Sequence, residues 1–395
     1  MGIEFTKCQQ NALPTIYKWF KSADSKQVFR IFGYAGCGKS FIVNYAIEQL
    51  GIDKLNDVKY ATYTGKSALV LRKRLLPATT IHKLIYTPIE EIEKIVMDDG
   101  TVKIKRRTKF VKKTCLDANI KLIVIDECSM VDEKIWNDLL SFNIPLIVLG
   151  DSGQLPPLRG KSPITAEEPD VFLDEIVRQS ADNPIIYLSM LARQGKDIPL
   201  GDYGDGISVI TKDDFFDDHL LTAEMVITTT NDLRDELNTY IRQELLGRTA
   251  PLPVEGDKLI CRKNNWDEVL NGIPLVNGLV GKVVNGPVEV CDYNTDLFAM
   301  NFRPEGFKNK QFEGLECNVK MFSPISAKER KDIIGNRYEL GNKFEYGYAI
   351  TTHLSQGSQA EEVLYYYEPF GNAEFRRQLL YTGITRAEKE LTLVL

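Results

Sequence analysis

The residues Gly33-Tyr34-Ala35-Gly36-Cys37-Gly38-Lys39-Ser40 decide the fold of this chain, because they join an apolar run at residues 28–32 to a helical pattern at residues 41–50. A strand that passes through a glycine-rich turn into a helix directs several backbone N–H groups and the positive helix end at one point, where phosphate groups bind. The spacing matches a Walker A loop. In such a loop Lys39 reaches the β- and γ-phosphates of a nucleotide, and the Ser40 hydroxyl holds Mg²⁺. The other interpretation is a glycine-rich turn before an ordinary helix.

Cys37 lies at the predicted amino terminus of this helix, where the helix end lowers the pKa of a thiol. We therefore expect a lowered thiol pKa and alkylation that a bound nucleotide blocks. The alternative is that Cys37 is a small residue that fits the loop and has no chemical role.

The composition is that of a globular chain. Its 395 residues, 43% of them apolar, favour roughly two to three domains. No apolar run approaches the ~18 residues of a membrane span, and residues 1–25 lack the layout of a signal peptide, so we expect an intracellular protein. The seven cysteines are scattered without a C-x-x-C pair, which predicts reduced thiols and neither a zinc site nor disulfides. A net charge of −6 argues against nucleic acid as a partner unless positive charge is gathered locally.

Two further predicted strands end in polar residues. Residues 121–126 form an apolar run that ends in Asp126-Glu127, the shape of a Walker B element, in which one carboxylate holds Mg²⁺ and the second acts on the attacking water. Residues 145–150 form another run, and Gln154 follows it. Because the carboxyl ends of parallel strands meet at one edge of a sheet, we expect these side chains close to the phosphates, in an open α/β domain.

A basic segment interrupts the alternation of strands and helices. Residues 95–105 predict a β-hairpin with Asp98-Asp99-Gly100 in the turn, and residues 103–113 hold seven lysines or arginines. One interpretation is an edge strand that its lysines protect from further pairing. The other, which we favour, is a basic appendage that meets a phosphate backbone. His82, one of three histidines, is equally open to a structural and a functional interpretation.

The second half of the chain repeats the α/β pattern around an insertion. A strand at residues 226–229 and a helix at residues 231–246 are followed, from residue 345 to the end, by further strands and a helix. Between them, residues 255–342 are rich in glycine, asparagine and short β-type runs, which predicts a small β-barrel insertion.

Several elements, in this order, resemble the motifs of superfamily 1B DNA helicases of the RecD and bacteriophage Dda type. Besides the two Walker elements, the similar segments are Tyr63-Thr64-Gly65-Lys66-Ser67-Ala68 (motif Ia), Thr80-Ile81-His82 (motif Ib), Gly150-Asp151-Ser152-Gly153-Gln154-Leu155-Pro156-Pro157 (motif III), Glu175-Ile176-Val177-Arg178-Gln179 (motif IV), Tyr348-Ala349-Ile350-Thr351-Thr352-His353-Leu354-Ser355-Gln356-Gly357 (motif V) and Leu380-Tyr381-Thr382-Gly383-Ile384-Thr385-Arg386-Ala387 (motif VI).

The resemblance implies an α/β fold with two RecA-like P-loop domains, a β-hairpin insertion in the first and a small SH3-like β-barrel insertion in the second. The first RecA-like domain is expected at residues 1–84 and 115–175, and the hairpin, as a strand-separating pin, at residues 85–114. The second RecA-like domain is expected at residues 176–254 and 343–395, and the SH3-like barrel at residues 255–342.

The resemblance also implies a role for each matching residue. Glu127 is expected to deprotonate the attacking water, and Arg178 and Arg386 to act as arginine fingers. The expected catalytic set is Lys39, Glu127, Gln154, Arg178 and Arg386. The expected ATP-binding residues are Gln9, as the adenine contact, with Gly33, Ala35, Gly36, Cys37, Gly38, Lys39, Ser40, Asp126, Gln154, Arg178, Gly357 and Arg386. Ser40 and Asp126 are expected to hold Mg²⁺. The expected contacts to single-stranded DNA are Thr64, Thr80, His82, Thr352, His353 and Gln356.

The implied function is that of an ATP-dependent DNA helicase that moves 5′ to 3′ on single-stranded DNA and separates the duplex with its pin, using ATP and Mg²⁺. Expected partners are single-stranded DNA and its junctions with duplex, with replication or single-strand-binding proteins as further candidates. We expect a monomer that binds no membrane, in the cytoplasm of a bacterium or a phage-infected cell.

Two departures from the family pattern keep an alternative open. Leu354 stands where many relatives carry a lysine, and the hairpin tip, Met97-Asp98-Asp99-Gly100, has no aromatic residue that could stack on a base pair. The alternative is a DNA-dependent ATPase that displaces bound proteins without efficient strand separation.

Overall fold

The computed structural model describes residues 5–22, 24–73, 75–96, 102–157, 162–175, 183–270, 273–289, 296–307, 309–323, 325–336 and 339–395. The chain divides into two compact units. The first consists of Met1–Ile85, Lys113–Thr230 and Thr351–Leu395, and the second of Tyr86–Lys112 and Asn231–Ile350.

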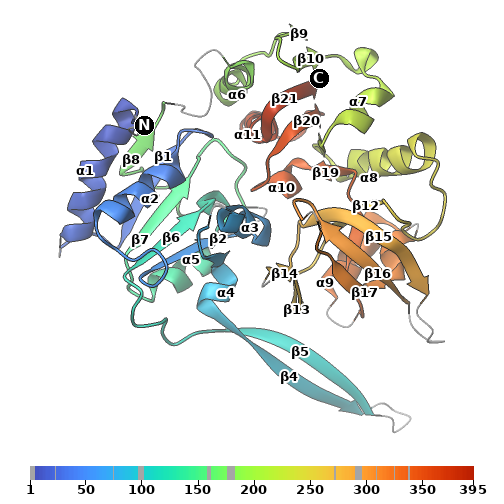
Figure 1. The fold of residues 1–395 in the computed structure, drawn as a ribbon, viewed down its shortest axis with the longest axis horizontal. Helices are drawn as coiled ribbons and strands as arrows, with labels where there is room; N and C mark the ends of the chain where they lie inside the picture. Colours follow the sequence, from blue (N-terminus) through green and yellow to red (C-terminus); the bar gives the residue numbers. More distant parts are fainter. Residues whose placement is uncertain are drawn as a thin grey trace. The chain divides into compact units, whose positions relative to one another are not determined.

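The first sheet of unit 1 carries the predicted phosphate loop (Figure 1). Its strands lie in the order β3-β2-β6-β7-β1-β8, and every neighbouring pair is parallel. The strands are β1 (Val28–Gly33), β2 (Val58–Thr62), β3 (Ala78–Thr80), β6 (Leu122–Asp126), β7 (Leu146–Gly150) and β8 (Val171–Leu173). The helices are α1 (Lys7–Lys21), α2 (Lys39–Gln49), α3 (Gly65–Lys73), α4 (Ile81–Ile85) and α5 (Glu133–Leu140), with a 3-10 turn, η1 (Cys128–Met130).

A continuous apolar core fixes this sheet against α1 and α2. All six residues of β1 are buried, as a central strand of a parallel sheet requires. Ile16 of α1 and Ile42 of α2 are fully buried in the same cluster, and burial of each such side chain stabilises the fold by about 1.5–3 kcal/mol. Thr6 and Gln9 cap α1 reciprocally, which fixes where the helix begins.

The second sheet of unit 1 is built from the later part of the chain. The strands β11, β20, β21, β10 and β9 lie side by side in that order, parallel except for β9. Their bounds are β9 (Gly201–Asp202), β10 (Ile207–Ile210), β11 (Met225–Thr228), β20 (Ala360–Tyr366) and β21 (Ala387–Val394). The helices are α6 (Pro184–Gln194), which packs on α11 (Ala373–Ile384), with α7 (Asp217–Thr222), α10 (Thr352–Ser355) and the 3-10 turn η2 (Lys212–Asp214).

Unit 2 contains a long hairpin and an antiparallel sheet. The hairpin pairs β4 (Tyr86–Val96) with β5 (Val102–Lys112) from Tyr86 opposite Lys112 to Val96 opposite Val102. The antiparallel sheet has the order β17-β16-β15-β12-β18. Its strands are β12 (Lys258–Cys261), β15 (Val280–Glu289), β16 (Leu297–Pro304), β17 (Phe312–Asn318) and β18 (Phe344–Tyr346). The other elements are α8 (Asn231–Tyr240), a π-helix η3 (Ile241–Leu245), β13 (Asn265–Leu270), β14 (Ile273–Leu275), η4 (Val319–Phe322), α9 (Ala327–Gly335) and β19 (Ala349–Thr351).

A buried carboxylate ties the π-helix to the start of the antiparallel sheet. Asp257 has no exposed surface. It accepts hydrogen bonds from Arg242 Nε at 3.0 Å, from Arg248 Nη1 at 2.9 Å and from the Tyr348 hydroxyl at 2.6 Å. A buried charge held by two guanidinium groups and a hydroxyl is satisfied, so it fixes this part of unit 2.

The predicted α/β architecture with parallel sheets is confirmed. The predicted β-hairpin is also present, as β4 and β5. The hairpin arms are longer than the predicted residues 95–105, while its tip, residues 97–100, lies outside the described residues. The SH3-like character of the inserted sheet and the expected domain limits stay predictions. None of the described helices is long and apolar enough to span a membrane.

Candidate active site

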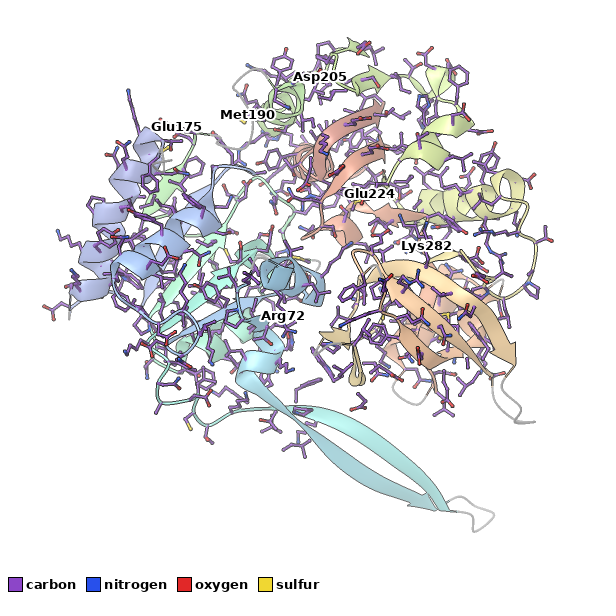
Figure 2. All side chains as sticks on the ribbon, viewed as in Figure 1. Arg72, Glu175, Met190, Asp205, Glu224 and Lys282 are labelled. Carbon is purple, nitrogen blue, oxygen red and sulfur yellow. The ribbon has the colours of Figure 1, made fainter. Side chains whose placement is uncertain are left out.

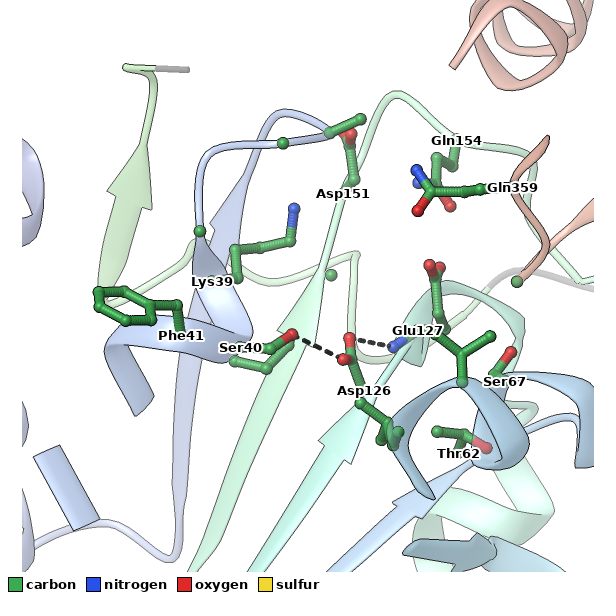
Figure 3. Close-up of a pocket in the computed structure, with 18 of the residues that line it drawn as sticks. Lys39, Ser40, Phe41, Thr62, Ser67, Asp126, Glu127, Asp151, Gln154 and Gln359 are labelled. Atoms are coloured by element: carbon green, nitrogen blue, oxygen red, sulfur yellow. Dashed lines mark hydrogen bonds between the residues drawn. The ribbon is translucent and has the colours of Figure 1, made fainter. Parts of the chain in front are cut away.

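A cavity of about 590 Å³ lies at the carboxyl ends of the first sheet, within unit 1. Figure 3 shows side chains of α2, of the end of β6 and of the segment after β7 around it, with Gln359 from the segment before β20. The lining residues are Gln9, Ala35, Gly36, Gly38, Lys39, Ser40, Phe41, Thr62, Ser67, Val70, Leu71, Asp126, Glu127, Leu149, Gly150, Asp151, Gln154, Gly357, Gln359, Arg386 and Glu388.

The loop from β1 to α2 has the geometry of a phosphate cradle. Gly36 and Gly38 have φ angles of 80° and 79°, in the left-handed region that residues with a side chain rarely adopt. The Lys39 ammonium donates to the backbone carbonyls of Gly33 and Tyr34, both at 2.8 Å. A phosphate would offer this ammonium a charged acceptor in the same cavity.

The predicted metal ligands lie next to each other. The Ser40 hydroxyl donates to Asp126 Oδ2 at 2.8 Å, and Asp126 Oδ1 accepts from the backbone N–H of Glu127 at 2.9 Å (Figure 3). No cluster of three or more His, Cys, Asp or Glu side chains that could hold a metal occurs in the part of the chain that the structure describes. One hydroxyl and one carboxylate fit Mg²⁺, which takes few protein ligands and completes its shell with water and phosphate oxygens.

Glu127 directly follows β6 and lines the cavity. Its φ angle of 55° is left-handed. Burial raises the pKa of its carboxyl group above the usual value, and the nearby positive charge of Arg386 opposes this shift. A carboxylate with a raised pKa is a stronger base, provided that it is deprotonated at the working pH.

Arg386 reaches the cavity from the second sheet. Its guanidinium group donates to Thr382 O at 3.0 Å, Ser358 O at 3.1 Å and Thr385 Oγ1 at 3.1 Å, and the residue is 3% exposed. These bonds orient the side chain from the end of α11 and from the segment before β20. Arg178, the other predicted arginine finger, lies outside the described residues.

A buried network beside the cavity was not predicted from the sequence. Asp151, after β7, accepts from Arg193 Nη1 of α6 at 2.5 Å and from the Tyr381 hydroxyl of α11 at 2.5 Å. The same hydroxyl accepts from the backbone N–H of Ala35 in the phosphate loop at 3.2 Å. Burial and the Asp151 charge raise the pKa of Tyr381, so its hydroxyl stays protonated and donates. A Cβ on Gly153 would lie 2.0 Å from Arg193 Nη1, which explains the glycine there.

The two sheets also meet through motifs III, V and VI. The N–H of Leu155 donates to Thr382 Oγ1 at 3.1 Å, and Gln356 Nε2 donates to Leu155 O at 3.2 Å. Gly357, with a φ angle of 73°, would carry a Cβ 2.0 Å from Ser67 Oγ. Residues far apart in the sequence are therefore brought to one edge of the cavity.

Three of the predicted nucleotide contacts, Gln9, Gly33 and Cys37, either do not line the cavity or hydrogen-bond to other parts of the chain. Gln9 lines the cavity but is 1% exposed; it donates to Cys37 O at 3.0 Å and accepts from Thr6 N at 3.2 Å. Gly33 and Cys37 do not line the cavity. Cys37 is fully buried, and burial raises the pKa of its thiol, so the predicted lowered pKa is wrong. The helix end acts on an exposed thiolate, whereas desolvation outweighs it here.

The predicted DNA contacts differ in exposure. Thr64 Oγ1 bonds Ser67 Oγ at 2.7 Å, and Thr80 Oγ1 accepts from Lys83 N at 3.2 Å. Burial lowers the pKa of both His82 and His353, which keeps these rings neutral near pH 7.

The remaining predicted contacts are buried. Thr352 has no exposed surface, and its hydroxyl donates to Thr228 O at 3.0 Å. Gln356 is 4% exposed. Neither side chain offers a surface to a ligand in this arrangement, and the DNA-binding roles of all six residues stay predictions.

Sequence reasoning missed some lining residues. Thr62, Gln359 and Glu388 line the cavity without a predicted role. Thr62 directly precedes the segment that resembles motif Ia, and this position is the signal that could have found it. Gln359 and Glu388 follow motifs V and VI closely in the sequence, but a glutamine or a glutamate there does not by itself predict a place in the cavity.

Comparison with known proteins agrees with this geometry. Residues 18–159 match the family described as an AAA domain, and residues 346–394 match the UvrD-like helicase C-terminal domain. The chain is 38% identical over 89 residues to the RecBCD enzyme subunit RecD of Buchnera aphidicola, which covers 22% of this chain and 12% of that protein. It is 32% identical over 133 residues to the ATP-dependent DNA helicase Pif1 of Campylobacter jejuni, covering 32% of this chain and 28% of that one.

The fold agrees with a solved helicase over nearly the whole chain. The crystal structure of Bacteroides Pif1 bound to single-stranded DNA has a TM-score of 0.52 and 16% identity, covering 99% of this chain and 92% of that one. Fold and site define a P-loop protein with RecA-like sheets around one nucleotide cavity. In its matched segments the chain is similar to helicases of the RecD and Pif1 type, and its fold is similar to that of Pif1. It spans only about a third of the length, or less, of the curated relatives that it matches.

Proposed function

We propose that this chain is an ATP-dependent DNA helicase that moves 5′ to 3′ along single-stranded DNA. One observation carries the proposal: Glu127 of the first sheet and Arg386 of the second line the same cavity as the phosphate loop. A base and a guanidinium from different sheets act together only when both sheets enclose the nucleotide, which couples hydrolysis to movement between them.

Each lining residue then has a chemical task. Lys39 binds the β- and γ-phosphates, and Ser40 and Asp126 would hold Mg²⁺, which when bound neutralises phosphate charge. Glu127 orients the attacking water and accepts its proton. Arg386 and Gln154 stabilise the charge that develops on the γ-phosphate. Arg178 is proposed for the same task on the resemblance of motif IV alone.

The DNA partner rests on the relatives. Pif1 of Campylobacter jejuni is named an ATP-dependent DNA helicase, and the Bacteroides Pif1 structure holds single-stranded DNA. Direction and the use of the hairpin as a pin come from the resemblance, and the long β4–β5 ribbon supports a pin of sufficient reach.

The substitution Glu127→Gln tests the chemistry. It keeps the size of the side chain and removes the base, so ATP and DNA binding should persist while single-strand-stimulated ATP hydrolysis falls at least 100-fold, within the ~10²–10⁴ that a positioned general base contributes. Fluorescent-nucleotide binding and a coupled ATPase assay measure the two quantities. A DNA-stimulated rate close to that of the unmodified protein would remove Glu127 from the mechanism.

Two partial duplexes of equal length, one with a 5′ tail and one with a 3′ tail, test strand separation and direction. ATP-dependent unwinding of the 5′-tailed duplex alone is expected. Unwinding of the 3′-tailed duplex alone would keep the motor and overturn the direction. DNA-stimulated hydrolysis with neither duplex unwound would favour the alternative enzyme, a translocating ATPase that displaces bound proteins, which Leu354 in motif V favours.

A further inference from the structure

A second groove, of about 620 Å³, lies in unit 1 away from the nucleotide cavity. β2 passes both places: its residue Thr62 lines the nucleotide cavity, and Lys59, near its start, lines the groove. Arg72 of α3, which is labelled in Figure 2, is one of the residues that line the groove. The groove is lined by Lys59, Arg72, Leu75, Leu76, Pro77, Ala78, Thr79, Lys83, Leu84 and Lys113.

The groove is strongly basic. Lys59, Arg72, Lys83 and Lys113 line it, and none of the lining residues carries a carboxylate. Asp117 lies 4.0 Å from the Lys59 ammonium, but its side chain is 76% exposed, so water screens its charge. In a chain whose net charge is −6, four cations in one groove are a local feature and not a consequence of composition.

Two of these cations are held in place by backbone carbonyls. Arg72 Nε donates to Ala78 O at 2.6 Å. The Lys113 ammonium donates to Leu84 O at 2.9 Å and to Lys83 O at 3.3 Å. A cationic side chain that is already ordered loses less conformational entropy when it binds an anion. The Lys83 and Lys59 side chains complete the basic rim.

The chemistry of the lining selects the kind of nucleic acid. Proteins that hold single strands stack bases on aromatic side chains, and none of the lining residues is aromatic. Contacts of lysine and arginine to phosphates bind the backbone without regard to bases. None of the residues predicted to contact single-stranded DNA lines this groove.

The chain connects the groove to the hairpin. β4 begins directly after Ile85, and Lys113 directly follows β5 and donates its N–H to Ile85 O at 2.9 Å. The groove therefore lies where both hairpin arms leave unit 1. The second arm continues the basic character, since residues 103–113 hold seven lysines or arginines.

We propose that this groove binds the phosphate backbone of the duplex ahead of the point where the strands separate. The proposal rests on the proposed helicase function, because it assigns the groove to the DNA that the hairpin meets. It adds a duplex-binding surface, separate from the nucleotide cavity and from the single-strand contacts of the motifs.

The double substitution Lys59→Gln with Lys83→Gln tests it without touching the two cations that bind backbone carbonyls. Affinity for a forked duplex and for a single strand of the tail sequence is measured by fluorescence anisotropy, without nucleotide, over a range of salt concentrations. Each lost phosphate contact reduces the slope of log K against log salt by about 0.9, so the slope for the fork should fall by about 1.8 and its Kd at 0.15 M salt should rise about 30-fold. The Kd for the single strand should change much less.

A matched control removes two lysines elsewhere. Lys212→Gln with Lys389→Gln, in η2 and β21, changes the net charge equally and should leave the fork Kd near that of the unmodified protein. Asp117→Asn removes the carboxylate beside Lys59 and should change the fork Kd little, because water already screens this exposed charge. Thermal unfolding of each variant establishes that it folds.

The outcomes separate the possibilities. Equal weakening of fork and single strand would assign the groove to the single strand and overturn the proposal. The proposal would also be overturned if the slope of log K against log salt for the fork stayed unchanged, or if the control variant lost as much affinity for the fork. If the unmodified protein shows no DNA-stimulated ATP hydrolysis, the proposed function fails, whereas the salt dependence of duplex binding still measures the groove directly.

Discussion

The hydroxyl of Tyr381, in motif VI, joins the phosphate loop at Ala35 to motif III at Asp151. We predict that Tyr381→Phe lowers the catalytic efficiency of single-strand-stimulated ATP hydrolysis about 30-fold. The substitution keeps the ring, which is 1% exposed and lies 5.1 Å from the Arg193 guanidinium carbon, and removes one oxygen. The packing of α11 is therefore retained.

The magnitude follows from the two bonds that the oxygen makes. The bond to the Asp151 carboxylate is buried and charge-assisted, and such a bond contributes about 1.5–3 kcal/mol. Asp151 keeps Arg193 and the N–H of Gly153 as donors, so its loss is partial. A net cost of about 2 kcal/mol corresponds to roughly 30-fold in an equilibrium constant. This free-energy cost destabilises the arrangement in which the two sheets are in contact. Ala35 and Asp151 follow strands of the first sheet, whereas Tyr381 lies in α11, beside the second.

The assay is steady-state ATP hydrolysis at saturating single-stranded DNA, with kcat and KM determined separately. Tyr60→Phe is the matched control, since Tyr60 of β2 is also buried and its hydroxyl donates to Asn44 Oδ1 of α2 at 2.8 Å, without contact to the second sheet. Both variants should lower the unfolding temperature slightly, and only Tyr381→Phe should lower kcat/KM strongly. Equal catalytic effects of the two substitutions would refute the role of Tyr381 between the sheets.

Three further predictions concern Gly357, Asp257 and Glu127. Gly357→Ala should lower DNA-stimulated ATPase activity, because its left-handed φ of 73° and the nearby Ser67 leave no space for a Cβ. Asp257→Asn should destabilise unit 2 by about 3–5 kcal/mol, measured by denaturant unfolding, because two arginines lose their charged partner. If Glu127 is the base, its raised pKa should make kcat fall with decreasing pH at a midpoint above the ordinary carboxyl value of 4.5, and a pH–rate profile measures this.

The phosphate loop and the Walker B strand could be predicted from the sequence because their chemistry is local. A strand, a glycine turn and a helix within a few residues fix where Lys39 and Ser40 lie, and an apolar run fixes Asp126 at the edge of the sheet. The family order of the motifs then supplied Arg386, whose type alone indicates nothing.

The Asp151–Tyr381–Arg193 network could not be predicted in this way. Asp151 is 230 residues from Tyr381 and 42 from Arg193 in the sequence, so only the folded chain brings them together. Cys37 illustrates the same limit for electrostatics: the sequence locates the helix end, but the burial that raises its thiol pKa depends on the whole core. In the hairpin, charged residues at positions 90, 91, 93 and 94 interrupt the apolar alternation, so the pattern indicated only the part of the ribbon near the tip.

The hydrogen bonds that hold Arg386 have a consequence for the proposed hydrolysis of ATP. The three nitrogens of its guanidinium group donate to Thr382 O in the last turn of α11, to Thr385 Oγ1 just after that helix, and to Ser358 O in the segment before β20. The side chain is therefore a fixed projection of its sheet and cannot swing toward a nucleotide alone. Under the proposed role of Arg386, its distance to the phosphates would change when its sheet moves, and the hydrolysis rate would then report the separation between the two sheets.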